Sequence, residues 1–111
     1  MSEKTKIIAI DFDDTFTADV KLWQIFIKYA KSRGHICVCV TGRSDEGQWG
    51  AEVRREIGGL IPIVFAGRKW KRDAAKEAGF DVDIWIDDNP EYIAEQGLLK
   101  TLVLEKQSPT H

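Results

Sequence analysis

The sequence predicts an α/β fold: a three-layer sandwich in which helices cover both faces of a five-stranded, mostly parallel, Rossmann-like sheet. Two observations lead to this prediction. Short continuous apolar segments, typical of strands buried on both faces, alternate along the chain with segments whose apolar residues recur at helical spacing. The chain has 111 residues, 43% of them hydrophobic, which suffices for one core but not for two. We therefore expect a single domain over residues 1–105 and a polar tail over residues 106–111.

The first part of the chain predicts two strands and the helix between them. Residues 7–10 form an apolar run that ends in acidic residues, which indicates a buried strand followed by a loop. A helix is expected over residues 19–33, before Gly34, because four apolar side chains lie near helical spacing: Val20, Trp23, Ile27 and Ala30. Residues 36–40 then predict a second buried strand.

A second helix and a third strand follow the same pattern. Ser44 has the type of side chain expected at a helix N-cap. Apolar residues recur every four positions after it and place one helical face on Trp49, Val53 and Ile57. Gly58 is expected to end this helix, and the apolar run over residues 61–66 predicts the third strand.

The remaining elements are read in the same way. The third helix is expected to show one face at Trp70, Ala74 and Ala78. Gly79 should end it as a left-handed residue, and residues 82–86 predict the fourth strand. Asn89 followed by Pro90 indicates another helix start, and residues 98–104 predict a fifth strand.

Composition and charge exclude several classes of protein. The net charge is -2, without the basic excess that binding to a nucleic-acid backbone requires. The longest apolar stretches are far shorter than the roughly 20 residues needed to cross a bilayer, so we expect a cytoplasmic protein with no membrane partner. Cys37 and Cys39 would share one strand face, too close for an unstrained disulfide, and are expected to be buried, reduced thiols.

Acidic residues follow directly after two of the predicted strands, at the edge where parallel α/β sheets bind their ligands. Asp11 and Asp13 come after the first strand, and on an extended backbone they would point the same way and share one site. Two carboxylates so close need a cation between them or a proton on one of them. Asp87 and Asp88, after the fourth strand, offer further oxygen ligands of the kind that Mg²⁺ prefers.

With these features the chain resembles the haloacid dehalogenase superfamily, as a small member without a cap domain. The pattern of that family is an apolar strand with D-x-D-x-T, a second strand ending in Thr or Ser, a Lys opening a later helix, and an acidic pair after a fourth strand. The matching segments are IIAIDFDDT, VCVTGR, a lysine within GRKWK, and IWIDD, in that order over about residues 6–88. The resemblance implies a Mg²⁺-dependent phosphomonoesterase that works through an aspartyl-phosphate intermediate.

The resemblance also implies a role for each acidic residue. Asp11 would attack phosphorus, while Asp13 would protonate the leaving oxygen and then activate the hydrolytic water. Mg²⁺ would be held by Asp11, by the backbone carbonyl of Asp13 and by Asp87. Asp88 would bind the metal through water, orient the lysine, or cap the next helix.

Three further residues are implied as phosphate ligands. Thr41 would donate a hydroxyl hydrogen bond to the phosphoryl oxygens, and Gly42 follows it at the same edge of the sheet. A lysine would add a positive charge. We favour Lys71, since Trp70 would then face the core, and keep Lys69 as the alternative. Arg43 could bind a substrate anion or form a surface ion pair.

The spacing of the motifs leaves no room for a cap domain. Only 25 residues separate Thr15 from Thr41 and 29 separate Thr41 from Lys71, and a helix and a strand nearly fill each interval. A site without a lid can accept a small phosphate ester or the phosphorylated end of a macromolecule, with nucleic acid only as substrate. A second copy of the chain could supply a roof.

Two other functions stay open on the sequence. A receiver-like phospho-acceptor also combines an acidic pocket, Mg²⁺, Thr and Lys on a small α/β sheet. Such a domain carries its acceptor Asp after the third strand, where this chain has Ala66 and Gly67. The other alternative is a catalytically weak module that binds a phosphate or nucleotide through the same pocket.

Overall fold

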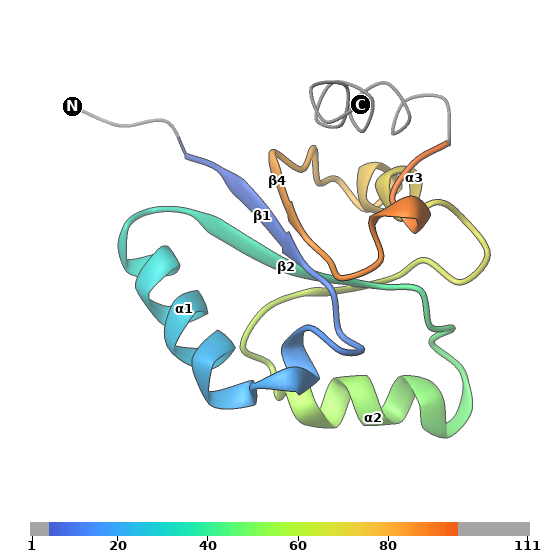
Figure 1. Ribbon diagram of the computed structural model, residues 1–111, viewed down its shortest axis with the longest axis horizontal. Helices are drawn as coiled ribbons and strands as arrows, with labels where there is room; N and C mark the ends of the chain where they lie inside the picture. The colour runs from blue at the N-terminus through green and yellow to red at the C-terminus, as the bar shows by residue number, and fades with distance from the viewer. Residues whose placement is uncertain (1–4, 96–111) are drawn as a thin grey trace, which may run out of the picture.

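Four parallel strands form one sheet at the centre of the computed structural model, which describes residues 5–95 (Figure 1). They are β1 (Ile7–Ile10), β2 (Ile36–Thr41), β3 (Ile63–Phe65) and β4 (Ile84–Ile86). Their order across the sheet is β3-β2-β1-β4, and every neighbouring pair is parallel. The α/β sandwich is therefore confirmed, but the described sheet has four strands where five were expected. The fifth predicted strand, residues 98–104, lies outside the described residues, as does the predicted tail.

Three α-helices connect the strands, and Figure 1 shows them on both sides of the sheet. They are α1 (Val20–Ser32), α2 (Gly47–Ile57) and α3 (Lys71–Glu77), and two short 3₁₀ helices are η1 (Phe16–Ala18) and η2 (Pro90–Tyr92). Side chains of α1 and α2 pack on one face of the sheet, and those of α3 pack on the other. These are the three layers that alternating strands and helices predict.

Strand residues alternate between two cores because successive side chains point to opposite faces of a sheet. The core under α1 and α2 includes Ile8, Ile10, Phe12, Phe16, Ile27, Ala30, Cys37, Cys39, Val53, Ile57 and Ile61. The core under α3 is smaller and consists of Ala9, Val38, Val40, Val64, Ala66, Ala74 and Ala75. Cys37 and Cys39 are free, and both are buried, as predicted.

The helix ends follow the local sequence, with one correction. Asp19 caps α1, since its carboxylate accepts a hydrogen bond from the Leu22 N–H at 3.1 Å. Gly58 ends α2, as predicted, and it does so in a left-handed conformation. Ser44 is not the N-cap of α2, because the helix begins only at Gly47. The Ser44 hydroxyl accepts instead from the Glu46 N–H at 3.1 Å, in the loop before the helix.

Two tryptophans and one alanine predicted to face the core are exposed. Trp49 has 62% of its surface exposed and Trp70 has 37%, while Ala78 is also exposed and Ala75 is buried in its place. Helical spacing identifies residues that share a face, but the length of that face covered by the sheet depends on how the helix is docked. Trp49 lies in the first turn of α2, and Trp70 precedes α3.

Within residues 5–95, every helix is too short or too polar to span a bilayer.

Candidate functional site

The carboxyl ends of the parallel strands open into a cleft of about 580 Å³. Its wall contains Asp11, Asp13, Asp14, Gly42, Gly67, Arg68, Lys69, Trp70, Lys71, Asp88, Asn89 and Tyr92. These residues come from the loops after all four strands. Most of the predicted site residues therefore lie at this edge of the sheet, where the strand order predicts them.

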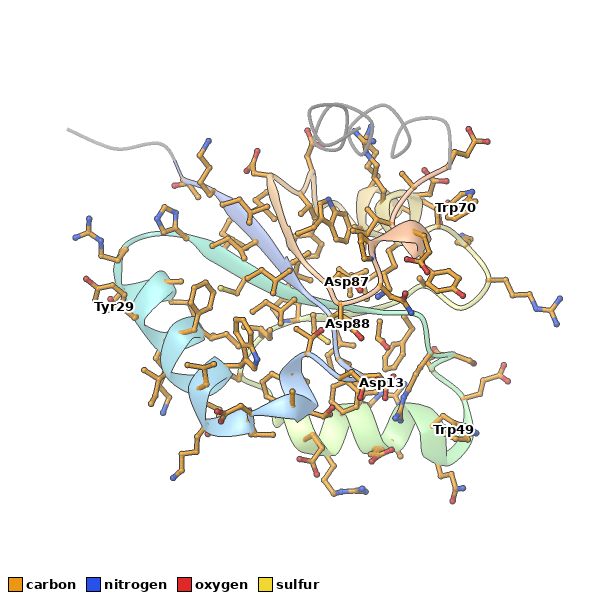
Figure 2. All side chains as sticks on the ribbon, viewed as in Figure 1. Asp13, Tyr29, Trp49, Trp70, Asp87 and Asp88 are labelled. Atoms are coloured by element: carbon orange, nitrogen blue, oxygen red, sulfur yellow. The ribbon has the colours of Figure 1, made fainter. Side chains whose placement is uncertain are left out.

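The register of β1 against β4 brings the two acidic segments together. Ile10 at the end of β1 is paired with Ile86 at the end of β4, and the Asp11 N–H continues the ladder with a 2.9 Å hydrogen bond to the Ile86 carbonyl. Asp11 and Asp87 are consequently neighbours on adjacent strands. Figure 2 shows Asp87 and Asp88 in this central region, with Asp13 nearby.

The backbone turns sharply after Asp11. The Asp11 carbonyl accepts from the Phe16 N–H at 3.1 Å, and the Phe12 carbonyl accepts from the Thr17 N–H at 3.0 Å. Asp14 has φ of 61°, a left-handed conformation that Asp tolerates better than most residues. The extended segment assumed for Asp11 and Asp13 is therefore wrong: the turn leaves Asp11 buried and carries Asp13 to the surface.

Lys71 contacts both buried carboxylates, those of Asp11 and Asp87. Its Nζ donates hydrogen bonds of 2.7 Å to Asp11 Oδ1 and of 2.7 Å to Asp87 Oδ2. Burial by itself lowers the pKa of Lys71, but these two hydrogen bonds and the charges of both partners raise it above its ordinary value. The ammonium group is thus held in its charged form at the centre of the site.

Lys69 is placed quite differently from Lys71. The Lys71 side chain is 6% exposed, whereas that of Lys69 is 57% exposed and forms an ion pair with the exposed Glu77. Lys71 is therefore the lysine that contacts the first acidic motif, and Lys69 lies on the cleft wall. Gly42 lies next to Lys71, because a Cβ built on this glycine would be 4.0 Å from Lys71 Cε.

Two opposing influences act on the pKa of Asp11. Burial raises its pKa to about 6, although the hydrogen bond and charge of Lys71 act in the opposite direction. The Thr15 hydroxyl lies 3.3 Å from Asp11 Oδ2 and 3.2 Å from Asp88 Oδ1, where it can donate to either oxygen. A divalent cation at this position would favour the ionised form of Asp11.

Three carboxylates have the donor set and the spacing that a hard cation requires. Asp11, Asp87 and Asp88 each offer an oxygen within 4.8 Å of the others. Together they carry three formal negative charges, of which Lys71 balances one, so the remainder equals the charge of one divalent cation. Carboxylate oxygens are the ligands that Mg²⁺ prefers, and these residues therefore fit that ion.

Arg43 holds Asp13 through both oxygens of its carboxylate. Arg43 Nε donates to Asp13 Oδ2 at 3.0 Å, and Nη2 donates to Asp13 Oδ1 at 2.7 Å. Nη1 donates to Glu52 Oε1 at 2.7 Å and to the Trp49 carbonyl at 3.0 Å. The guanidinium carbon lies 5.1 Å from the ring centroids of both Phe12 and Trp49. The hydrogen bond to Asp13 raises the pKa of Arg43 further above its ordinary value, so the guanidinium stays charged.

Thr41 and Asp87 are absent from the wall of the cleft. Thr41 is fully buried, and its hydroxyl oxygen accepts from the Arg43 N–H at 3.2 Å. Asp87 accepts from Lys71 with one oxygen and from the Asn89 N–H, at 2.9 Å, with the other. The predicted contact of Thr41 with phosphate stays a prediction, as does the metal contact of the Asp13 carbonyl.

Sequence reasoning missed the partners of Arg43 and the aromatic wall of the cleft. Glu52 and Trp49 lie nine and six positions from Arg43, on a helix whose orientation the local sequence does not specify. Trp70 was expected in the core, and Tyr92 was not singled out. One sequence feature could have indicated that Trp70 is exposed. Four basic residues surround it in the segment GRKWKR, and charged side chains are rarely buried.

Comparison with known proteins gives no further assignment. No protein-family model, no curated protein and no solved structure matches this chain.

Proposed function

We propose that this chain is a Mg²⁺-dependent phosphomonoesterase of the haloacid dehalogenase type. The observation that carries the proposal is the buried Asp11, which faces an open cleft while contacting Lys71 at 2.7 Å and lying within 4.8 Å of two further carboxylates. A nucleophilic carboxylate, a fixed ammonium group and a cation-binding set on one sheet edge are the components that phosphoryl transfer requires.

Asp11, Asp87 and Asp88 would hold the Mg²⁺ ion. When bound, the ion neutralises charge on the phosphoryl group and on the carboxylates. Lys71 contributes a second fixed positive charge at Asp11. Its two hydrogen bonds keep the side chain in one position, so little reorganisation is needed when charge develops on the phosphoryl oxygens.

In the first step, an oxygen of Asp11 attacks phosphorus and the bond from phosphorus to the ester oxygen breaks. The leaving alcohol oxygen takes a proton from Asp13, and an aspartyl-phosphate remains on Asp11. In the second step, Asp13 removes a proton from water, the water oxygen attacks phosphorus, and the bond to Asp11 breaks. Inorganic phosphate leaves, and both aspartates return to their starting states.

Arg43 constrains the proton transfer that Asp13 would perform. Both Asp13 oxygens accept from Arg43, so one of these bonds must lengthen before that oxygen can carry a proton. The guanidinium is anchored independently by Glu52 and by the Trp49 carbonyl. It can therefore stay in place while the Asp13 side chain moves between Arg43 and the substrate.

The same ion pair favours one alternative, a phospho-acceptor that hydrolyses its aspartyl-phosphate slowly. If Asp13 stays bound to Arg43 through both oxygens, it activates water poorly. The phosphoryl group would then stay on Asp11, because the aspartyl-phosphate is hydrolysed more slowly than it forms, and a persistent phosphoprotein would result. The two functions differ in the fate of the phosphoryl group after it reaches Asp11.

The deciding experiment measures inorganic phosphate released from a panel of phosphate monoesters, with Mg²⁺ or with EDTA. The unmodified protein is compared with Asp11→Asn, which removes the nucleophile with little change in volume. Asp81→Asn is the matched control, because it makes the same chemical change at an exposed residue before β4, at the opposite edge of the sheet.

The proposal requires Mg²⁺-dependent release that is lost in Asp11→Asn and retained in Asp81→Asn. Labelled phosphoprotein without release would favour the phospho-acceptor. A folded protein that neither releases phosphate nor becomes labelled would contradict both the phosphomonoesterase and the phospho-acceptor.

A further inference from the structure

Beyond its acidic residues, the cleft has a wall of aromatic and basic side chains that the proposed reaction does not use. Trp70 and Tyr92 both line the cleft, with 37% and 56% of their surfaces exposed. Arg68 and Lys69 line it on the loop before α3, and Asn89 on the segment after β4. Figure 2 shows Trp70 beside α3, away from Asp87 and Asp88 in that view.

The two aromatic residues come from separate segments that the fold ties together. Trp70 immediately precedes α3, and Tyr92 ends η2. The Arg72 N–H, in the first turn of α3, donates a 2.8 Å hydrogen bond to the carbonyl of Ile93. This bond joins the segments that carry Trp70 and Tyr92, and both residues line the cleft.

The cleft is much larger than a phosphate group needs. Its volume of about 580 Å³ lies within the range of roughly 300–1,000 Å³ typical of sites for drug-sized ligands. With the phosphoryl group at Asp11 and Lys71, the rest of the ester has the remaining cleft, whose wall includes Trp70. An aliphatic leaving group would leave most of that wall in contact with water.

Basic residues gather around Trp70, on a different segment of the cleft wall from the acidic residues. The acidic residues follow β1 and β4, whereas the segment GRKWKR carries four basic residues around Trp70. One of them, Lys71, is buried at Asp11, and Lys69 is paired with Glu77. Arg68 lies exposed on the cleft wall, where it can meet a second anionic group of a substrate.

We propose that the substrate of this site is a nucleotide whose base stacks on Trp70, with Tyr92 as a second aromatic surface. Flat heteroaromatic bases stack on exposed aromatic side chains, and the guanidinium of Arg68 supplies the basic group that accompanies such stacking platforms. The Asn89 amide offers a donor and an acceptor beside them. The phosphate belongs to a nucleoside monophosphate or to the end of a single strand. This inference rests on the proposed function for the orientation of the phosphate.

The test measures binding and does not depend on turnover. The full-length Asp11→Asn protein is titrated, in Mg²⁺, with adenosine 5′-monophosphate and with ribose 5-phosphate, which has the same phosphate and sugar but no base. We expect the nucleotide to bind about 5- to 150-fold more tightly, the range expected for one stacked base. Trp70→Leu in the same background should abolish the difference, and Trp70→Phe should retain most of it.

Tyr29→Leu serves as the control, because this exposed aromatic residue lies on α1, away from the cleft. It should leave the preference for the nucleotide unchanged. A 5′-phosphorylated oligothymidylate then distinguishes the two sources of the phosphate. If the oligothymidylate binds more tightly than a mononucleotide, and Arg68→Gln weakens that binding, the substrate is the end of a strand. If the two bind equally, the substrate is the free nucleotide.

Equal affinity for adenosine 5′-monophosphate and ribose 5-phosphate would overturn the inference, even if phosphate release from other esters supports the reaction. So would a preference for the nucleotide that survives Trp70→Leu. A base-dependent, Trp70-dependent preference in a protein that releases phosphate from no ester would uphold the nucleotide site and reject the reaction.

Discussion

Replacing Lys71 with methionine removes the charge at the centre of the site and keeps a side chain of similar length. The ammonium group bonds to Asp11 and Asp87 at 2.7 Å each, and the three side chains are between 2% and 7% exposed. Without Lys71, two buried carboxylates lose their compensating charge. Breaking a buried ion pair on one side costs about 3–5 kcal/mol of unfolding free energy.

Urea denaturation in the presence of EDTA measures this cost, because EDTA prevents a divalent cation from replacing the lost charge. For a small domain, with a urea dependence of about 1–3 kcal/mol per molar, the midpoint should fall by about 2 M. Lys69→Met is the matched control. Its ion pair with Glu77 is more than half exposed on both sides, and such pairs contribute about 0–1 kcal/mol.

The double variant Asp11→Asn/Lys71→Met refines the same test. Asp11→Asn removes one of the two carboxylates that Lys71 compensates, so the double variant should lose less stability than the sum of the single variants, by about 0.5–3 kcal/mol. Equal stability losses in Lys71→Met and Lys69→Met would refute the reasoning, since they would mean that the buried carboxylates do not depend on Lys71.

Three further predictions concern other parts of the structure. Arg43→Lys should lower the unfolding free energy in urea by about 1 kcal/mol, because lysine cannot bond to Asp13 through both oxygens; a loss no larger than that of the exposed Arg55→Lys would contradict this. The two cysteines should react slowly with a disulfide reagent at mildly alkaline pH and fully in urea, because burial raises both thiol pKa values, that of Cys39 to about 12; rapid reaction of the folded protein would refute it. Gly50→Ala should lower Tm although alanine favours helices by about 1 kcal/mol, because its Cβ would collide with the Asp45 backbone; a higher Tm would show that this loop moves away freely.

Sequence periodicity was sufficient to predict the order of the described strands and α-helices. Apolar runs marked the four described strands, since strands buried on both faces need apolar side chains at successive positions. Asp11, Asp13, Asp87 and Asp88 were expected at one edge because they follow parallel strands, whose carboxyl ends meet there. These features depend on local spacing and on the general geometry of a parallel sheet, so one sequence can determine them.

The direction of individual side chains required the tertiary structure. Lys71 and Lys69 are two residues apart, and only the docking of α3 turns one toward Asp11 and leaves the other with Glu77. The pairing of Asp13 with Arg43 joins residues 30 positions apart, across a turn that local sequence rules read as extended.

Exposure of the tryptophans was the other feature that only the tertiary structure decided. Periodicity assigns Trp49 and Trp70 to buried helical faces, yet both side chains are exposed, and Trp70 precedes its helix. Spacing specifies which side chains point the same way along a helix. Whether that direction leads into a core or into a cleft depends on where the helix begins relative to the sheet, which is set by contacts between residues distant in the chain.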